Sequence, residues 1–468
     1  MPAEGRGLSS RLAYEATENR RLAIRLKTPR KIRKLQEALH AKAKSSPACR
    51  FYLLYDKLYR ADILAYAYAC CHANGGAAGV DGQDFSDIES YGQERWLGEL
   101  SEELRSKTYC PQAVRRVYIP KPDGKQRPLG IPTVKDRVVQ MAAVLVLGPI
   151  FEADLQPEQY AYRPGRNALD AVRQVKALLD NWYKDVVDAD LSGYFDSIPH
   201  AELMRSVARR ISDKHILALI KMWLQMPVEE IDKRGRRHRI DHDKGQGCGS
   251  PQGSPSPISP LLSNIYMRRF VLGWKVLGHE RRLDAHIVNY ADDLVICCRG
   301  NAEQAMAAMR NMMEKLKLTV NETKTRICCV PDESFDFLGY TFARCYSPRT
   351  GNAYVGTYPS RKAVKKLLRE VSEMTDRSLV LLSVEQMVNR LNAKVRGWAN
   401  YFCLGLGPVD KCYRTIDAHV RYRFRQWYRS KHKMRCLEIS RFPDDYLHGT
   451  LGLVRLKSRP LDYSCAKA

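Results

Sequence analysis

The stretch "NYADDLVICC", residues 289 to 298, sets two adjacent aspartates, Asp292 and Asp293, between two apolar runs. Residues 285 to 288 form the first run and residues 294 to 298 the second. Short apolar runs joined by a brief polar interruption predict two strands of a hairpin, with the aspartates at its turn. Like charges a few ångströms apart raise each other's pKa unless a positive charge lies close by. The stretch therefore predicts a bound cation at the turn.

The residue types indicate which cation this is. Oxygen ligands favour Mg²⁺ or Mn²⁺ over zinc, and phosphoryl or nucleotidyl transfer generally uses two ions about 3.5 to 4 Å apart. A second ion needs a further carboxylate from elsewhere in the chain. In "VVDADL", residues 186 to 191, the period of two along a strand places Asp188 and Asp190 on one face, just before a Ser-Gly turn. We expect Asp190 to lie beside the hairpin if the two segments pair in one sheet.

The bulk composition narrows the class of protein. A chain of 468 residues that is 44% hydrophobic can bury a core and divides into two to four domains. Lysine and arginine total 77 against 52 acidic residues, a net charge of +25 that favours a nucleic-acid partner. No window is apolar enough to span a membrane and the N-terminus lacks a signal-peptide core, so we expect no membrane partner and a cytoplasmic chain, in the bacterial cytosol. Fourteen cysteines without a C-x-x-C pair are expected to be reduced thiols.

The pattern along the chain predicts an α+β fold. Residues 1–82 form a basic N-terminal segment, helical from about residue 19 and closed by the turn-rich "NGGAAGVDG". Residues 83–345 mix helices with short strands, including a basic β-hairpin in "AVRRVYIPKPDGKQRPLGIP" (113–132). After Tyr346 the pattern is helical again through residues 346–432, and residues 433–468 form a short basic tail.

Seven ordered motifs carry a resemblance to a known family. The motifs "YIPKPDGKQRPLGIP", "YAYRPGRNALDAV", "DADLSGYFDSI", "GSPQGSPSPISPLLSNIY", "YADD", "LKLTVNETKT" and "FDFLGYTF" follow the order of the reverse transcriptase blocks of group II intron-encoded proteins. The later "LNAKVRGWANYF" resembles their maturase region, domain X. The resemblance covers nearly everything from residue 28 onward. It implies a right-hand polymerase, with fingers and palm at 83–345, an all-helical thumb and domain X at 346–432, and a possible remnant of a DNA-binding segment at 433–468.

The resemblance also implies roles for individual residues in RNA-directed DNA synthesis by two-metal nucleotidyl transfer. Two Mg²⁺ ions, or Mn²⁺ in their place, would be held by the carboxylates Asp190, Asp292 and Asp293, and Lys324 would be a general acid toward pyrophosphate. The residues that would contact the nucleotide are Lys121 and Arg127 on the triphosphate, Phe195 under the deoxyribose, and Gln252 with Gly253 against the new base pair. Without the family, Lys121 and Arg127 are as readily exposed hairpin charges, and an aromatic residue at 195 is more often core.

One departure from the family concerns "PQGSPSPISPLL", where this chain has an extra Ser-Pro after Gly253. The added residues alter the loop that carries Gln252. In the C-terminal helices, basic residues interleave with aromatic ones, which suits a surface for structured RNA. The candidate RNA-binding residues are Arg396, Trp398, Arg421 and Arg425. The alternative is that the aromatic residues are core and the arginines form an ordinary solvated face.

The resemblance implies partners and leaves three functions open. The partners are group II intron RNA, an RNA template with a DNA or RNA primer, target DNA and deoxynucleoside triphosphates. No paired C-x-x-C motif is present, so the chain resembles the endonuclease-lacking types. The first function is a reverse transcriptase that assists splicing and mobility of its intron. The second is an RNA-binding splicing factor with an idle polymerase site, and the third is a host-adopted reverse transcriptase in defence or repair.

Overall fold

The computed structural model describes residues 26–120, 126–231, 237–240, 256–347, 349–405, 407, 409–434 and 443–456. The chain divides into two compact units. The first comprises Met1–Pro164, Leu191–Leu277 and Arg310–Asn321, and the second comprises Gly165–Asp190, Gly278–Met309 and Glu322–Ala468. The chain therefore passes between the units several times. The predicted functional boundaries after residues 82, 345 and 432 remain predictions.

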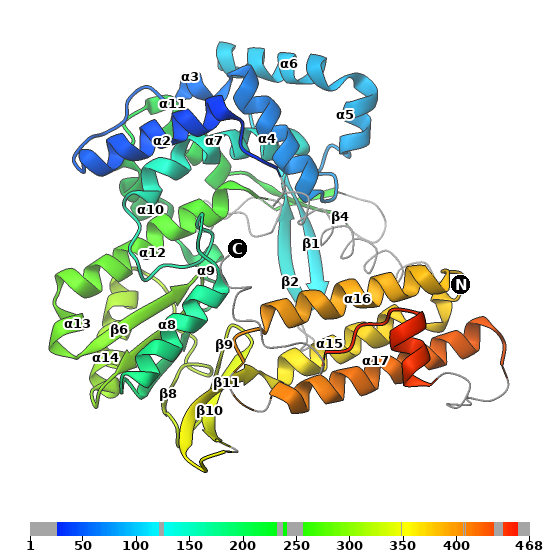
Figure 1. Ribbon diagram of the computed structural model, residues 1–468. Helices are drawn as coiled ribbons and strands as arrows, with labels where there is room; N and C mark the ends of the chain where they lie inside the picture. Colours follow the sequence, from blue (N-terminus) through cyan, green and yellow to red (C-terminus); the bar gives the residue numbers. More distant parts are fainter. Residues whose placement is uncertain are drawn as a thin grey trace. The chain divides into compact units, whose positions relative to one another are not determined.

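The first unit is built around helix α7 (Val134–Glu152), which is buried along most of its length. Thr133 caps this helix, because its side chain accepts a hydrogen bond from the backbone N–H of Asp136. Helices α2 (Arg30–Ser45), α4 (Ala61–Asn74) and α12 (Ile258–Val276) pack against α7, as Figure 1 shows. The other helices of this unit are α3 (Tyr55–Leu58), α5 (Phe85–Tyr91), α6 (Gln93–Ser106), α9 (Tyr194–Ser197), α10 (His200–Ala208) and α11 (Lys214–Leu224).

The first unit also contains a four-stranded sheet in the order β2-β1-β4-β5. Strands β1 (Val114–Pro120) and β2 (Gln126–Ile131) pair antiparallel, which confirms the hairpin predicted at 113–132. Strand β4 (Val228–Ile231) runs parallel to β1 and antiparallel to β5 (Arg237–Ile240). The hairpin forms because valine, isoleucine and tyrosine favour extended backbone, and the Pro-Asp-Gly segment between the strands favours a turn.

The second unit holds the sheet that carries the aspartates. Its order is β6-β7-β3-β8, with β6 (Ala285–Tyr290), β7 (Asp293–Cys298), β3 (Asp185–Asp190) and β8 (Arg326–Cys329) all antiparallel. Residues 294 to 298 are all fully buried, which explains their unbroken apolar run. Helix α8 (Ala168–Asp180) packs against this sheet and begins at a capping box between Asn167 and Asp170. The strand before the Ser-Gly turn and the hairpin at 289–298 are both confirmed.

A second sheet and a group of helices complete this unit. The sheet has the order β11-β10-β9, formed by β9 (Phe335–Phe337), β10 (Tyr340–Tyr346) and β11 (Ala353–Pro359). The expectation of helix directly after Tyr346 was wrong for β11, where alternating aromatic and β-branched residues pair with β10. The helices that follow are as predicted: α15 (Arg361–Met374), α16 (Val384–Tyr401) and α17 (Val409–Lys431), drawn in yellow to orange in Figure 1. The remaining elements of the unit are α13 (His279–Arg282), most of α14 (Ala302–Lys315), η1 (Arg377–Leu379) and η3 (Tyr446–Thr450).

Helices α15 to α17 share a core of their own, formed by residues such as Leu367, Leu391 and Phe424. The described cysteines are free thiols, and Cys297, Cys298 and Cys328 are buried as packing residues. Within the part of the chain that the structure describes, no helix combines the length and the apolarity of a membrane span.

Candidate active site

The hairpin turn between β6 and β7 consists of only two residues, Ala291 and Asp292. Tyr290 pairs with Asp293 across the ladder, so Asp292 lies at the tip and Asp293 is the first residue of β7. Ala291 has a φ of 58°, the left-handed conformation that tight hairpins require and that is costly for a residue other than glycine. The buried side-chain amide of Asn289 donates to the backbone oxygen of Ala291 at 2.9 Å. This hydrogen bond therefore stabilises the strained backbone conformation of the turn.

Strand β3 lies between β7 and β8 and brings a third carboxylate to this turn. The register of β3 against β7 places Asp190 directly opposite Asp293. Side chains of directly opposed residues in an antiparallel pair have Cβ atoms about 4.5 to 5.5 Å apart. Asp188 lies on the same face of β3, two residues earlier, as its alternation with Val187 and Ala189 requires. Two stretches about a hundred residues apart thus converge their acidic side chains.

Burial, with the convergence of the aspartates, raises the pKa of two of these carboxyl groups. Burial, followed by the charges of Asp292, Asp190 and Asp188, raises the pKa of Asp293 to about 7. Burial also raises the pKa of Asp188 to about 6, where the neighbouring charge of Arg326 opposes the rise and that of Asp190 adds to it. Burial is the larger cause of both shifts, and the neighbouring aspartates add to it.

Lys324 reaches the cluster through the register of β8. Asp188 pairs with Arg326, and the same register continued by two residues brings Lys324 opposite Asp190. The Nζ atom of Lys324 lies 3.1 Å from Oδ2 of Asp190, and the backbone N–H of Asp190 donates to Oγ1 of Thr325 at 3.4 Å. The lysine side chain is 66% exposed, whereas that of Asp190 is 25% exposed. Lys324 thus partly offsets the charge of Asp190 from the solvent side.

The donor set of this site fits a hard divalent cation. Its candidate ligands are carboxylate oxygens only, the ligand type that Mg²⁺ and Mn²⁺ prefer. Among the described residues, no three metal-ligating side chains already converge at coordination geometry. The fit therefore rests on the chemistry of the donors and on the register that places Asp190 opposite Asp293.

The candidate nucleotide contacts belong to the first unit. Lys121, Gln252 and Gly253 lie outside the described residues, and Arg127 lies in β2 with its side chain also outside them. Phe195 is half-buried in α9, with its ring 5.6 Å from the ring of Tyr194.

Two described residues next to candidate nucleotide contacts, Tyr194 and Ser256, are anchored within the first unit. Tyr194 is the core residue of this pair, because it is buried and its hydroxyl donates to the backbone oxygen of Ser263 at 2.7 Å. Phe195 is the more accessible ring of the two. Ser256, in the segment with the extra Ser-Pro, is buried and donates to Oε1 of Gln140 at 3.1 Å. The segment is thus tied to α7 directly after the part that the structure leaves undescribed.

One residue close to the carboxylates was not predicted from the sequence. Tyr401, at the end of α16, donates from its hydroxyl to the backbone oxygen of Leu338 at 2.8 Å. Burial, with smaller effects of Tyr290 and Asp293, raises the pKa of Tyr401 to about 12. The end of α16 therefore packs near the β6–β7 turn. No local pattern could reveal this, because the contact joins residues more than a hundred positions apart.

The candidate RNA-binding residues of the C-terminal helices have different surroundings. Arg396 is exposed on α16, whereas Trp398 packs against Phe402, with ring centroids 4.5 Å apart. Arg421 and Arg425 both form ion pairs with Asp444, at 3.2 and 2.8 Å, and their side chains are mostly buried. These two arginines fasten the segment after α17 to that helix, and Trp398 contributes to the aromatic packing. Their roles in RNA binding remain predictions.

Two family profiles match this chain. "Reverse transcriptase (RNA-dependent DNA polymerase)" covers residues 119–342, and "Group II intron, maturase-specific domain" covers residues 364–441. Protein YkfC of Escherichia coli (strain K12) is 34% identical over 372 residues, which span 71% of this chain and 93% of YkfC. The chain belongs to the group II intron reverse transcriptase and maturase family. As a member of this family it is an RNA-directed DNA polymerase with a maturase domain, and divalent metal ions are general to its polymerase domain.

Other similar proteins match this chain over only part of their own length. Group II intron-encoded protein LtrA of Lactococcus lactis subsp. cremoris is 33% identical over 232 residues, 48% of this chain and 36% of LtrA. Among solved structures, the "Partial Cas6-RT-Cas1--Cas2 complex" matches with a TM-score of 0.33 and 22% identity, covering 56% of this chain and 41% of that one. The chain thus spans nearly all of YkfC but about a third of LtrA.

Proposed function

We propose that this chain synthesises DNA on RNA templates by two-metal nucleotidyl transfer and assists the splicing and mobility of a group II intron. The observation that carries the proposal is the pairing of Asp190 with Asp293 beside the Asp292 turn. Asp190, Asp292 and Asp293 would hold two Mg²⁺ ions, or Mn²⁺. When bound, such ions lower the pKa of the attacking hydroxyl and neutralise charge on the triphosphate and the leaving pyrophosphate.

The protein side chains position the substrates and the protons. The Asn289 amide keeps the turn in the conformation that presents Asp292 beside Asp293. Lys324 offsets the charge of Asp190 before substrate binds, and then its exposed ammonium donates a proton to the leaving pyrophosphate. Lys121 and Arg127 bind the triphosphate, and Gln252 and Gly253 lie against the new base pair. In-line transfer requires little from the protein beyond this positioning and charge neutralisation.

Phe195 selects the sugar of the incoming nucleotide. Its ring lies in the half-buried position of α9, while Tyr194 takes the core position next to it. A ring under the deoxyribose leaves no room for a 2′-hydroxyl, so ribonucleotides are excluded. Phe195→Ala should raise ribonucleotide incorporation in a primer-extension assay, and Tyr194→Phe, which changes only the buried neighbour, should not. Unchanged sugar discrimination in Phe195→Ala would remove this role.

The intron partner is proposed on the maturase-specific domain and on the exposed basic side chains of α15 and α16. These include Arg361, Lys362, Lys365, Lys366 and Arg396. The proposed DNA synthesis implies further partners: target DNA, an RNA template with its primer, and deoxynucleoside triphosphates.

The test is cDNA synthesis by the purified full chain on an RNA template with a DNA primer, deoxynucleotides and Mg²⁺. We expect full-length product from the wild type and none above background from Asp292→Asn. In parallel, the Asp292→Asn protein should still promote splicing of a group II intron transcript, because the carboxylate serves only polymerisation. A wild-type protein that promotes splicing without making cDNA would favour the splicing factor with an idle polymerase site. A protein that makes cDNA without affecting splicing would favour the host-adopted enzyme.

A further inference from the structure

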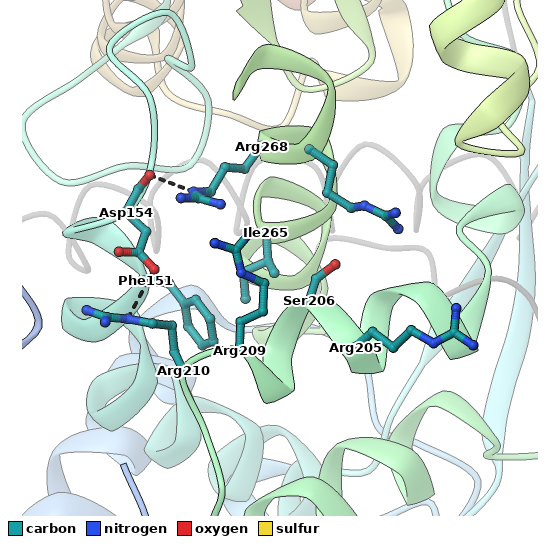
Figure 2. A pocket seen from close by; sticks show the side chains of 9 residues that line it. Phe151, Asp154, Arg205, Ser206, Arg209, Arg210, Ile265 and Arg268 are labelled. Carbon is teal, nitrogen blue, oxygen red and sulfur yellow. Dashed lines mark hydrogen bonds and ion pairs between the residues drawn. The ribbon is translucent and has the colours of Figure 1, made fainter. Parts of the chain in front are cut away.

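A cavity in the first unit is lined by five arginines and a single carboxylate. It has a volume of about 280 Å³ and lies between the end of α7, helix α10 with the residues that follow it, and α12. The charged residues of its lining are Arg205, Arg209, Arg210, Arg268, Arg269 and Asp154. Figure 2 labels all of them except Arg269. The five arginines exceed the one aspartate by four positive charges. None of these residues belongs to a motif that the polymerase reaction uses.

The only carboxylate of the cavity, Asp154, is already engaged. Nε of Arg210 lies 3.1 Å from Oδ2 of Asp154, and Nε of Arg268 donates to the backbone oxygen of Asp154 at 2.7 Å. Both interactions are drawn as dashed lines in Figure 2. Arg210 also donates to the backbone oxygens of Ser46 and Cys49, so it ties the end of α2 to this wall. Asp154 and Arg210 therefore build the cavity and are not available to a ligand.

Two arginines of the cavity have no such anchor. Arg205 and Arg209 are exposed, and neither forms an ion pair with any residue in the described part of the chain. They stand four residues apart at the end of α10, a spacing at which like charges on a helix repel. Arg209 lies beside Arg268 in Figure 2, and burial, together with the charges of Arg209 and Arg210, lowers the pKa of Arg268. Arginine stays protonated even so. The charges of Asp154, beside Arg268, and of Glu202, near Arg205, offset part of the repulsion, and a bound anion would offset more.

The chemistry of the walls identifies the anion as a phosphate group. The planar guanidinium presents paired N–H donors that match phosphate oxygens, and several arginines around one cavity are typical of phosphate recognition. Phe151 and Ile265, both buried, close the floor with apolar surface. The volume lies at the small end of the roughly 300 to 1,000 Å³ of cavities that enclose whole ligands. It suits a phosphate and the adjoining sugar of a polymer better than a free nucleotide.

From these contacts we infer that the cavity between α10 and α12 binds a backbone phosphodiester of structured RNA. Arg205, Arg209 and Arg269 would hold the phosphate, and Arg268 would line its inner side. The choice of RNA as the source of the phosphate rests on the proposed function. The cavity shares no residue with the carboxylate cluster or with the candidate nucleotide contacts, so it adds a contact of its own.

The direct test is chemical modification of arginine by phenylglyoxal, read residue by residue by peptide mass spectrometry on the full chain. Three samples are compared: protein alone, protein with a folded group II intron transcript, and protein with inorganic phosphate. We expect the transcript to slow the modification of Arg205 and Arg209 several-fold and to leave Arg281 and Arg282 unchanged. The last two are exposed on α13 and serve as matched internal controls. Protection by inorganic phosphate alone would assign the cavity to a free anion, and protection by neither ligand would overturn the inference.

A second measurement uses the salt dependence of RNA affinity. Each phosphate contact that is lost lowers the log–log salt slope by about one. Arg205→Gln/Arg209→Gln should lower the slope by about one more than the equally charged Arg281→Gln/Arg282→Gln. Arg205→Lys/Arg209→Lys keeps the charge, and it should keep the slope while losing the bidentate geometry and part of the affinity. Equal slopes in both glutamine variants would overturn the inference.

These results are separable from the failure of the proposed function. If the wild-type protein makes no cDNA on a simple primer-template, the polymerase proposal fails, whatever happens at the cavity. If cDNA is made but Arg205 and Arg209 are not protected by the transcript, only the inference about the cavity fails.

Discussion

The β6–β7 turn and helix α17 each hold like charges close together. The two regions differ in how far those charges are paired with opposite ones. On α17, Arg421 and Arg425 share Asp444, and both guanidinium groups are thereby paired. Although burial opposes it, the bond from Arg425 and the nearby charge of Arg421 lower the pKa of Asp444. At the turn, Asp190 and Asp293 face each other, and the nearest cation, Lys324, is largely exposed to solvent.

The difference separates structural charge from functional charge. A compensated cluster such as that on α17 stabilises the fold and needs no ligand. A cluster whose charges are only partly offset costs free energy in the empty protein, and a bound ion of opposite sign recovers it. At the carboxylate turn Lys324 is paired with Asp190 from the solvent side, and in the cavity between α10 and α12 one carboxylate accompanies five arginines. The first is therefore a candidate site for cations and the second for anions. Substitutions at the carboxylate turn should therefore affect catalysis, and substitutions at the ion pairs of α17 should affect stability.

The largest effect is expected at the turn. Asp190→Asn should lower cDNA synthesis by about a thousandfold, because the loss of about 4 kcal/mol of charge stabilisation in the transition state corresponds to that factor. The measurement is the single-turnover rate on a primer-template in Mg²⁺. Asp185→Asn removes the same charge at the other end of β3, where Asp185 accepts from the N–H of Gly300, and should change the rate little. Equal losses of rate in the two variants would contradict a specific role of Asp190 at the carboxylate turn.

The next effect concerns the compensated cluster. Asp444→Ala leaves Arg421 and Arg425 mostly buried without their partner, so the free energy of unfolding should fall by about 2 kcal/mol, between the values for surface and buried pairs. Denaturant unfolding measures it. Glu373→Ala is the control, because its ion pair with Arg369 is exposed and 3.7 Å long, and its cost should be below about 0.5 kcal/mol. If Asp444→Ala is no worse than the control, α17 is not held by this pairing.

The third effect is the pH dependence of cation binding. A divalent cation competes with the proton on Asp293, whose pKa is about 7 in the metal-free chain. Apparent Mg²⁺ affinity should therefore fall by up to about tenfold for each pH unit below 7 and level off above it. Calorimetric titration at pH 6, 7 and 8 measures the trend. An Mg²⁺ affinity that does not change with pH would mean that the ion does not compete with the proton on Asp293.

The raised pKa of Asp293 also predicts how the stability of the metal-free protein depends on pH. Its folded pKa is above the ordinary value of 3.8, so the folded state holds a proton that the unfolded state has lost between these values. Its contribution to stability is fully present below pH 4 and is lost as the pH rises through 7. Asp293→Asn should remove the part of this slope above about pH 6, because the raised pKa of Asp188, about 6, adds a slope of its own below that pH. Asp444→Asn, at the compensated cluster, should leave the slope above pH 6 in place.

The smallest effect concerns the hydrogen bond between the end of α16 and the β9–β10 turn. Tyr401→Phe removes the hydrogen bond to Leu338 and should lower the free energy of unfolding by about 1 kcal/mol. Tyr422→Phe is the matched control, because the Tyr422 ring is 55% exposed and its hydroxyl only accepts a bond from the nearby Gln426. If both variants lose the same stability, the end of α16 is not held by its hydrogen bond to Leu338.

Much of the carboxylate site could be predicted from the sequence because its signals are local. The apolar runs around Asp292 and the alternation before Asp190 specify two strand ends, and the motif order brings them into one polymerase domain. The pairing of Asp190 with Asp293 depends on sheet register, which only the tertiary fold fixes. Lys324 was selected by its motif, yet its ion pair with Asp190 follows from the same register.

The features that sequence reasoning missed are those that join distant segments. The hydrogen bond from Tyr401 to Leu338 spans the β9–β10 turn and the end of α16. Arg421 and Arg425 were predicted to contact RNA because basic and aromatic residues interleave in these helices, and that role stays a prediction. Their shared ion pair with Asp444 was not predicted. Strand β11 was missed because helical periodicity further along was extended back over it. The cavity of five arginines draws on three elements, none of them distinctive alone.

The most direct test of the central claim is the anomalous scattering of Mn²⁺ in crystals of the chain with a primer-template and a deoxynucleotide. We predict manganese peaks within about 2.2 Å of carboxylate oxygens of Asp190 and Asp292, as coordination by oxygen ligands requires. Peaks that lie elsewhere, or no peak near these two aspartates, would contradict the account.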